Sequence, residues 1–200
     1  AEARETIVSV DAGNFALLPA NADLTAAEIQ LMQEMGREYR LRNALEPVRG
    51  LYDYVLIDCP PAINVLTLNA LTAADGVLIP IQCEYYALEG LSSLLETVRQ
   101  VRNTVNRRLQ IEGLLRTMYD PRNSLTLDVS AQLSAHFGDK LYQTVIPRNV
   151  RLAEAPSFGM PALAYDKQSR GAVAYLALAG EVVRRSKQAA KAAAVTDLNE

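Results

Sequence analysis

The chain has 200 residues and a mass of 21.9 kDa, enough for one domain with a substantial core. Half of its residues are hydrophobic, 22% are charged and the formal net charge is −3, which is ordinary for a soluble globular protein. No apolar run approaches the length of a membrane span, and the first residues do not resemble a signal peptide. We therefore expect a single cytoplasmic domain over residues 1–200, with a flexible tail at 188–200.

The two cysteines, Cys59 and Cys83, do not predict a disulfide framework. Each ends or follows a predicted strand, so we expect each to be a small buried residue. The charge is uneven along the chain, because residues 99–170 hold eleven basic and six acidic side chains. Nine of those eleven are arginines, which favour planar recognition of phosphate. Composition alone makes nucleic-acid binding plausible, and a plain solvated surface is the alternative.

In the first half of the chain, strand and helix patterns alternate. Thr25 and Glu28 have the spacing of a capping box, which predicts a helix start. Pro80 lies inside an apolar run and favours a strand end or a bulge there. The expected strands are 15–19, 54–57 and 76–82, and the expected helices are 25–45 and 64–73.

The second half continues the alternation. Apolar residues at helical spacing predict helices over 87–105, 125–137 and 171–191, and strands are expected over 111–118 and 140–146. Strands that alternate with helices form βαβ units, in which the strands are parallel and helices cover both faces. The sequence therefore predicts an α/β domain with a mostly parallel sheet.

The run from Tyr54 to Ile57 is short, continuous and apolar, which is typical of a strand buried on both faces of a parallel sheet. It stops at Asp58, and Pro60 and Pro61 prevent further pairing. Ligands of open α/β sheets bind beyond the carboxyl ends of the strands. Asp58 is therefore a candidate ligand of hydrated Mg²⁺ beside a nucleotide phosphate, and a turn-capping residue is the alternative. The single histidine, His136, rules out a two-histidine metal site.

Four stretches closely resemble the ParA (Soj) chromosome- and plasmid-partition ATPases, a deviant-Walker (SIMIBI) group of P-loop NTPases that also contains MinD. They are residues 52–91, 117–120, 145–157 and 169–172. The resemblance extends over roughly residues 16–183 and implies the P-loop NTPase fold. The family's Gly-rich phosphate loop and the following segment with its attacking-water Asp do not occur in these 200 residues. We expect both upstream of Ala1, so that the chain is the carboxyl-terminal part of such an ATPase and lacks its first strands.

The resemblance implies roles for individual residues. Asp58 would be the catalytic residue that holds Mg²⁺ through water and senses the γ-phosphate of ATP. Adenine would bind at Met118 and at the turn that contains Pro147 and Asn149. Asn69 and Asp75 lie in matching segments, but helix surface and turn are the simpler interpretations.

Non-specific contacts with duplex DNA would come from basic side chains in predicted loops. Arg122 and Arg151 match positions implicated in DNA binding in the family, and Lys140, Lys167 and Arg170 extend the patch.

The resemblance implies slow ATP hydrolysis coupled to an ATP-dependent homodimer. That dimer would coat the nucleoid, and a ParB-type centromere-binding partner would stimulate hydrolysis and release it. One alternative is a MinD-like membrane-associated ATPase, but the tail from Glu181 to Val195 lacks the bulky apolar residues such an anchor needs. A second alternative is a DNA- or partner-binding protein without a nucleotide site.

Because the phosphate-loop lysine and the attacking-water Asp lie outside this sequence, we expect the purified 200-residue polypeptide to show no ATP turnover. Steady-state phosphate release should equal that of an Asp58→Ala control. Release clearly above the control would contradict the expectation.

Overall fold

The structure is a computed structural model that describes residues 2–197. The chain divides into two compact units. The first consists of Ala1–Val77 and Leu88–Glu112, and the second of Leu78–Ala87 and Gly113–Glu200. Strands β3 (Gly76–Gln82) and β4 (Gln110–Tyr119) each begin in the first unit and continue into the second.

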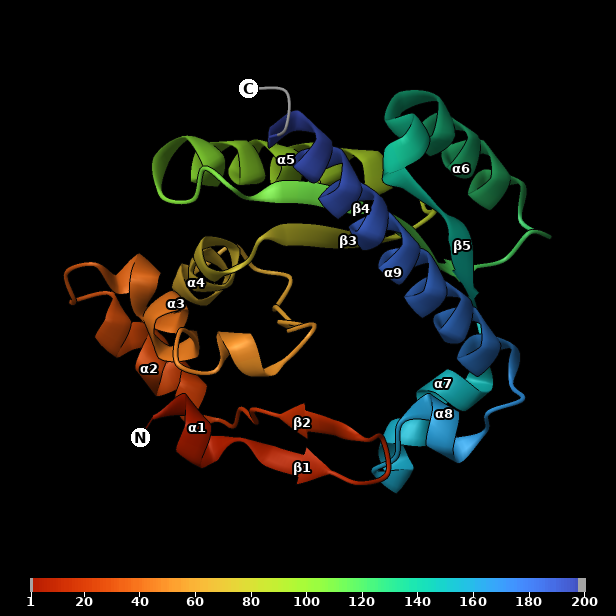
Figure 1. Cartoon of the computed structure of the whole chain (residues 1–200). Helices are drawn as coiled ribbons and strands as arrows, with labels where there is room; N and C mark the ends of the chain where they lie inside the picture. The colour runs from red at the N-terminus through yellow and green to blue at the C-terminus, as the bar shows by residue number, and fades with distance from the viewer. Residues whose placement is uncertain (1, 198–200) are drawn as a thin grey trace. The chain divides into compact units, whose positions relative to one another are not determined.

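The first unit starts with a short helix and an antiparallel hairpin, drawn in red in Figure 1. Its elements are α1 (Ala3–Thr6), β1 (Val8–Val10), β2 (Phe15–Leu17), α2 (Asp23–Leu31), η1 (Arg37–Tyr39), α3 (Arg40–Leu45), η2 (Arg49–Leu51), α4 (Val65–Ala73) and α5 (Ala87–Thr104).

The long helix expected over 25–45 is divided in the structure. It begins two residues earlier than expected, at Asp23, whose backbone N–H donates to the side chain of Asn21 at 2.9 Å. The first helix ends at Leu31, and Gly36 then adopts a left-handed conformation with φ of 64°. Such a conformation suits glycine and is incompatible with a continuing helix. The capping-box prediction at Thr25 was wrong.

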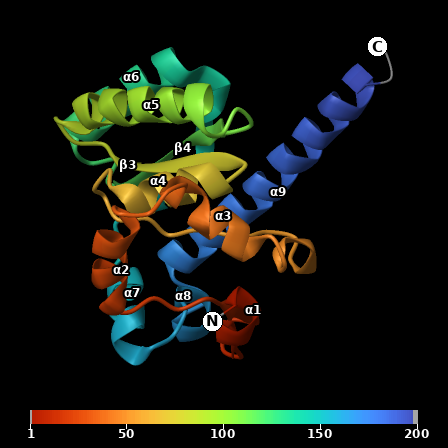
Figure 2. The same cartoon turned by 90° about the vertical axis from the view of Figure 1, so that its left-hand side faces the viewer.

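Buried asparagines hold the helices of the first unit together. The amide of Asn69 on α4 accepts from the N–H of Leu41 at 3.0 Å and donates to the carbonyls of Arg37 and Val65. This links α3 to α4, which lie side by side in Figure 2. Asn106 donates to the carbonyls of Leu71 and Ala74, both at 2.8 Å. It therefore satisfies carbonyls at the end of α4, which helix geometry leaves without intrahelical partners.

The apolar core of the first unit lies between α4, α5 and the adjoining strand ends. Its fully buried members are Leu71, Val98, Val101 and Leu109. Asn69, for which helix surface was the simpler interpretation, is only 3% exposed. Its hydrogen bonds are all to backbone groups of its own unit, which gives it a structural role.

Residues 52–63 form neither helix nor strand, so the buried strand expected at Tyr54–Ile57 is absent. Leu56 is 92% exposed and Tyr54 is half exposed. An apolar run becomes a buried strand only when neighbouring strands take up its backbone N–H and C=O groups. Within residues 2–197, no strand pairs with this segment. Cys59 in the same segment is exposed, so its predicted burial was wrong, whereas Cys83 is buried as predicted.

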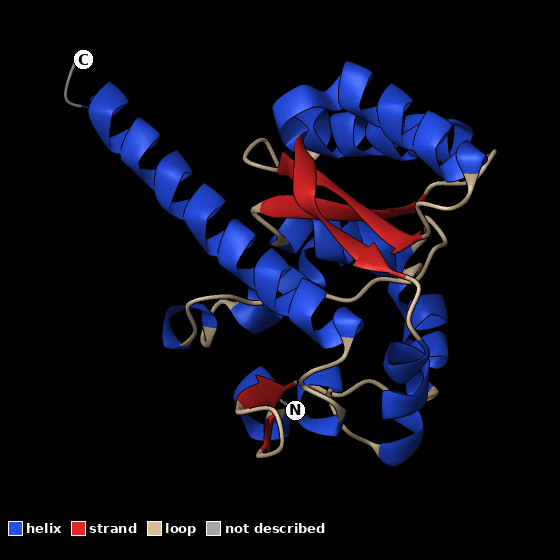
Figure 3. Cartoon of the chain, turned by 90° about the vertical axis from the view of Figure 1, so that its right-hand side faces the viewer, coloured by secondary structure: helices blue, strands red, loops and turns tan. Residues whose placement is uncertain are grey.

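The second unit carries most of the three-stranded sheet, shown in red in Figure 3 with order β3-β4-β5. Its further elements are α6 (Ser124–Phe137), η3 (Gly138–Lys140), β5 (Leu141–Pro147), α7 (Val150–Glu154), η4 (Ala155–Phe158), α8 (Ala162–Tyr165) and α9 (Arg170–Asp197). The α/β fold with a parallel sheet flanked by helices is confirmed. Pro80 lies within β3 on the edge of this sheet, where a missing N–H is tolerated.

The parallel pairing of β4 with β5 contains two register shifts. Between the pairs Leu114–Leu141 and Arg116–Val145, β4 advances two residues and β5 advances four. Between Arg116–Val145 and Tyr119–Pro147, β4 advances three residues and β5 two. The first shift is a bulge in β5, and the second is a bulge in β4 beside Met118. Both bulges free backbone groups from the ladder.

Charged side chains take up the backbone groups of the β5 bulge. Glu181 of α9 accepts from the N–H groups of Gln143 and Thr144, each at 2.9 Å, and from the Thr144 hydroxyl. From β4, the guanidinium of Arg116 donates to the Tyr142 carbonyl at 2.9 Å. Helix α9 therefore packs on β5 through a polar clamp as well as through apolar contacts (Figure 1).

Arg185, one turn after Glu181, completes this clamp. It donates to Glu181 and to the carbonyls of Asp139 and Leu141, and its guanidinium lies 4.1 Å from the ring centroid of Tyr142. Burial raises the pKa of the Glu181 carboxyl. The N–H groups of Thr144 and Gln143, the Thr144 hydroxyl and Arg185 outweigh burial and lower this pKa to about 2.

The start of α9 shows why Ser-Arg-Gly-Ala occurs at 169–172. The Ser169 hydroxyl accepts from the N–H of Ala172 at 3.2 Å and caps the helix. A Cβ at Gly171 would lie 2.5 Å from the side chain of Leu152 on α7, so only glycine permits this contact. Ala172 itself is fully buried.

We expect Glu181→Gln to lower the free energy of unfolding by about 1.5–3 kcal/mol at neutral pH, because a buried charged acceptor of four hydrogen bonds is lost. Since the folded pKa of Glu181 lies below its ordinary value of 4.5, its contribution is present above pH 4.5 and is lost as the pH falls towards 2. Urea unfolding at several pH values measures both effects.

The exposed Glu89→Gln on α5 is the matched control and should lower the free energy of unfolding by no more than about 1 kcal/mol, the contribution of a carboxylate in the first turn of a helix. Equal stability of the two variants at pH 7 would contradict the expectation that the hydrogen bonds of Glu181 stabilise the fold.

Candidate functional site

A polar pocket of about 100 Å³ lies in the second unit, where β3, β4 and β5 end. Ligands of open α/β sheets bind at such carboxyl edges. The pocket residues come from the ends of all three strands and from the first turn of α6. They are Gln82, Cys83, Glu84, Met118, Asp120, Asn123, Thr126 and Arg148.

The bulge in β4 shapes this pocket. Met118 has φ of 51°, a left-handed conformation that costs a residue with a Cβ about 1–2 kcal/mol. Its side chain is 41% exposed at the pocket. On the neighbouring strand end, the N–H of Arg148 donates to the Tyr119 carbonyl at 3.3 Å. This hydrogen bond holds the ends of β4 and β5 together at the pocket.

The turn after β4 brings a helix start to the pocket. Asp120, Pro121 and Arg122 lead to Asn123, whose side chain accepts from the N–H of Leu125 at 3.0 Å and caps α6. Asp120 accepts two hydrogen bonds from the Arg122 guanidinium, at 2.9 and 2.7 Å. Hydrogen bonds from the side chain and backbone of Arg122 lower the pKa of Asp120 to about 2. The Asp120 carboxylate therefore stays ionised beside the pocket at neutral pH.

Cys83 is the buried wall of the pocket, with an exposed fraction of 4%. Burial raises the pKa of its thiol, and the nearby charge of Arg116 opposes that shift. A thiol with a raised pKa is mostly protonated at neutral pH and reacts poorly as a nucleophile. Cys83 therefore lines the pocket as a small neutral group.

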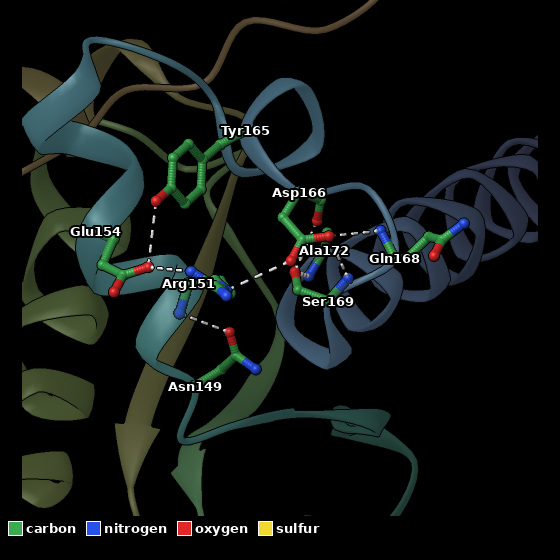
Figure 4. Close-up of polar contacts among 8 residues, drawn as sticks. All are labelled: Asn149, Arg151, Glu154, Tyr165, Asp166, Gln168, Ser169 and Ala172. Carbon is green, nitrogen blue, oxygen red and sulfur yellow. Dashed lines mark hydrogen bonds and ion pairs between the residues drawn. The ribbon is translucent and has the colours of Figure 1, made fainter.

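A second polar cluster surrounds Arg151 on α7 (Figure 4). Its guanidinium donates to the Glu154 carboxylate at 2.9 Å and lies 3.5 Å from an oxygen of Asp166. The Tyr165 hydroxyl donates to the same Glu154 oxygen at 3.2 Å. Asn149 caps α7 by accepting from the N–H of Arg151 at 3.0 Å. Hydrogen bonding and attraction to Glu154 raise the pKa of Arg151, so it stays charged.

The residues predicted to contact adenine lie close together in the second unit. Met118 lines the pocket, and Pro147 and Asn149 flank Arg148, which also lines it. Asp58 belongs to the first unit and lies in its exposed irregular segment. The structure therefore brings together the residues predicted to contact adenine. Asp58, in contrast, does not follow a strand.

The five predicted DNA-binding residues fall at two ends of the second unit. Arg122 follows β4 and Arg151 follows β5, at the carboxyl edge of the sheet. Lys167 directly follows Asp166, which contacts Arg151, and Arg170 is the first residue of α9. Lys140 precedes β5, and a strand of seven residues, roughly 20 Å long, separates it from Arg151. Arg151 is therefore close to the turn that contains Lys167, whereas Lys140 lies at the opposite edge of the sheet.

Sequence analysis missed most of the pocket. Arg148 was predicted only as part of the turn from Pro147 to Asn149. The residues not predicted as site residues are Gln82, Cys83, Glu84, Asp120, Asn123 and Thr126. One available signal was the rule that parallel strands end at a common edge, because all of these residues except Thr126 lie at or shortly after a predicted strand. Thr126 lies in the helix expected over 125–137. Asp75, in a segment matching the family, forms an exposed ion pair with Arg49 at 2.6 Å.

Within the described residues, no group of three or more His, Cys, Asp or Glu side chains could hold a metal ion. In the same part of the chain, no helix is long and apolar enough to cross a membrane.

Comparison with protein families and curated proteins identifies relatives. A family model described as an AAA domain matches residues 1–111. The chain is 57% identical over 180 residues to the chromosome partitioning protein ParA of Caulobacter vibrioides, covering 88% of this chain and 67% of that protein. It is 53% identical over 182 residues to the sporulation initiation inhibitor protein Soj of Bacillus subtilis, covering 91% and 72%.

Solved structures resemble the whole fold. A cobyrinic acid a,c-diamide synthase from Mycobacterium smegmatis has a TM-score of 0.78 and 36% identity, covering 94% of this chain and 69% of that chain. The same synthase with bound ADP and magnesium has a TM-score of 0.76. A plasmid partition protein from Borrelia burgdorferi has a TM-score of 0.61 and 27% identity, covering 73% and 58%.

The left-handed conformation of Met118 predicts an unusual response to substitution. Met118→Gly should match or exceed the parent in stability, because glycine adopts this conformation without strain. Met118→Val should lower the free energy of unfolding by about 1–2 kcal/mol, since a β-branched residue is disfavoured at positive φ. Urea unfolding midpoints of the two variants test this. A valine variant as stable as the glycine variant would show that the position is not strained.

Proposed function

Because the chain belongs to the ParA/Soj family of chromosome-partitioning ATPases, we propose that the intact protein uses ATP binding and hydrolysis as a switch in DNA segregation. Its relatives at more than 50% identity include ParA and Soj proteins, whereas the diamide synthase is 36% identical. The partition role is therefore better supported than amide synthesis.

The pocket at the carboxyl ends of β3, β4 and β5 is the observation that carries the nucleotide part of the proposal. Met118 offers apolar surface for a base, and Asn123 and Arg148 offer polar groups at the same opening. The pocket is lined mainly by polar groups, which would bond the edge of a base while Met118 packs against its face. We assign it to the base of ATP, with Pro147 and Asn149 completing the turn beside it. The solved synthase with bound ADP and magnesium supports nucleotide binding by proteins of this fold.

Asp58 is proposed to hold magnesium through water. Mg²⁺ is commonly bound by one or two carboxylates together with waters and substrate phosphates, so a single carboxylate suffices. Bound ATP and Mg²⁺ would supply the phosphoryl-transfer chemistry, in which the protein's part is positioning and electrostatic stabilisation. Asp58 can hold Mg²⁺ only if residues 54–58 keep one conformation. A neighbouring strand that pairs with the apolar run at 54–57 would provide this.

The proposed cycle also needs three kinds of partner. ATP would join two copies of the protein into a dimer, and the dimer would bind duplex DNA of the nucleoid without reading its sequence. A ParB-type partner would then stimulate hydrolysis. The basic residues at the carboxyl edge of the second unit supply the phosphate contacts in this scheme. They are Arg122, Arg151, Lys167 and Arg170, and Lys140 would have to act separately.

The test is nucleotide binding by the intact protein. Replacement of Met118 by Ala should weaken the affinity for a fluorescent ADP about three- to tenfold, because apolar surface against the base is lost. Alanine keeps a Cβ at this position, so the backbone strain is similar in both proteins. The control is Met35→Ala, which removes a methionine that is 95% exposed and lies outside the pocket.

Affinity measured by fluorescence titration should separate the two variants. Equal affinities for Met118→Ala, Met35→Ala and the parent would reject the pocket as the base site.

A further inference from the structure

Two of the arginines predicted to contact DNA, Arg122 and Arg151, are already paired with carboxylates of their own unit. Arg122 forms its pair with Asp120, two residues before it. Arg151 lies between Glu154, one turn along α7, and Asp166 in the turn before α9, as Figure 4 shows. The side chains of Arg122 and Arg151 are 87% and 53% exposed. Each guanidinium is therefore within reach of solvent and of a phosphate.

The carboxylates halve the positive charge of the surface around Arg151. Residues 148–170 contain four basic side chains, Arg148, Arg151, Lys167 and Arg170, and two acidic ones, Glu154 and Asp166. Both acidic side chains contact Arg151. A DNA phosphate that approaches Arg151 must therefore displace a carboxylate or share the guanidinium with it.

The two carboxylates differ in how firmly they are held. The other oxygen of Asp166 accepts from the N–H groups of Gln168 and Ser169, both at 3.1 Å, so Asp166 is part of the turn before α9. Glu154 accepts from the Tyr165 hydroxyl and Arg151, and it lies at the end of a five-residue helix. Glu154 is the partner that can rotate away from Arg151, and it makes the shorter contact, at 2.9 Å against 3.5 Å.

We propose that Glu154, supported by Asp166, competes with DNA phosphates for the Arg151 guanidinium and so limits the affinity of this surface for duplex DNA. The inference rests on the proposed function, because it assumes that the intact protein binds DNA. An exposed ion pair changes an equilibrium constant by up to about fivefold. A competition of this size permits binding while keeping it weak and readily reversed.

The test measures the affinity of the intact protein for a labelled random-sequence DNA duplex, in the presence of ATP and Mg²⁺ and across a range of salt concentrations. Glu154→Gln should raise the affinity about two- to fivefold, since the amide is neutral and can still accept from Tyr165. The slope of log affinity against log salt should steepen by less than about 0.9, the share of one whole phosphate contact, because Arg151 already makes part of that contact in the parent.

Two controls separate competition from a general change in charge. Asp128→Asn removes one exposed carboxylate from α6 in the same unit and gives the effect of net charge alone. The second control places Glu154→Gln in an Arg151→Gln background. Because the competition needs Arg151, the gain from Glu154→Gln should fall there to that of Asp128→Asn.

Asp166→Asn is a second variant that keeps one oxygen for the turn before α9. It should raise the affinity less than Glu154→Gln does, and thermal melts should confirm that each variant is folded. A folded Glu154→Gln protein with no more affinity than Asp128→Asn would overturn the inference. A gain that persists without Arg151 would overturn it too.

The outcomes separate this inference from the proposed function. If the parent and every variant fail to bind the duplex, the DNA-binding part of the proposed function fails together with the inference. If the parent binds and Arg151→Gln weakens that binding, but Glu154→Gln does not strengthen it, the inference alone fails. Nucleotide binding at Met118 is measured independently of both.

Discussion

The bulge in β5 depends on charged side chains. They form hydrogen bonds with the backbone groups that have no partner in the neighbouring strand. A buried backbone group without a partner costs as much as a lost hydrogen bond, so this irregularity persists only because its N–H and C=O groups are satisfied. Glu181 of α9 takes the N–H groups, and Arg116 of β4 takes a carbonyl. The same contacts fix α9 against β5, so helix position and strand register are set together. The packing of Leu178 beside Tyr142 and Ile146 follows from that arrangement.

The two bulges act on different ends of the strand pair. The first gives β5 extra residues near its start, and the second gives β4 an extra residue near its end. The second bulge places Met118 in a strained backbone conformation, at the point where the strands open into the pocket. Bulges and strained residues are concentrated at functional sites, because they aim side chains that a regular ladder would point elsewhere. Strain in this unit therefore lies beside the pocket, while the clamp at the other bulge stabilises the fold.

Guanidinium–carboxylate pairs serve two purposes in this protein, and burial decides between them. The Glu181 side chain is 7% exposed, and it bonds to backbone groups as well as to Arg185. Such a pair cannot exchange partners without leaving a buried charge unsatisfied. Arg151 and Glu154 meet where both are reached by solvent, and an exposed pair contributes little stability. A pair of that kind can yield its arginine to another anion. The buried pair of Glu181 and Arg185 thus stabilises the fold. The exposed pair of Arg151 and Glu154 leaves the arginine able to bind another anion.

The sequence by itself determined the order of most helices and strands in residues 64–191, because local patterns and caps such as Asn64 and Asn123 act over a few neighbouring residues. It also placed Met118, Pro147 and Asn149 at the carboxyl edge, since parallel strands end together. It could not reveal the bulges or the role of Glu181, because these contacts join residues up to 38 positions apart. The contact of Arg151 with Asp166 joins residues 15 positions apart and is likewise set by tertiary structure, whereas Glu154 is only three positions from Arg151. The strand expected at Tyr54–Ile57 is the clearest case. Its apolar pattern is local, but strand formation requires backbone partners from elsewhere in a sheet, and only tertiary structure decides whether they are present.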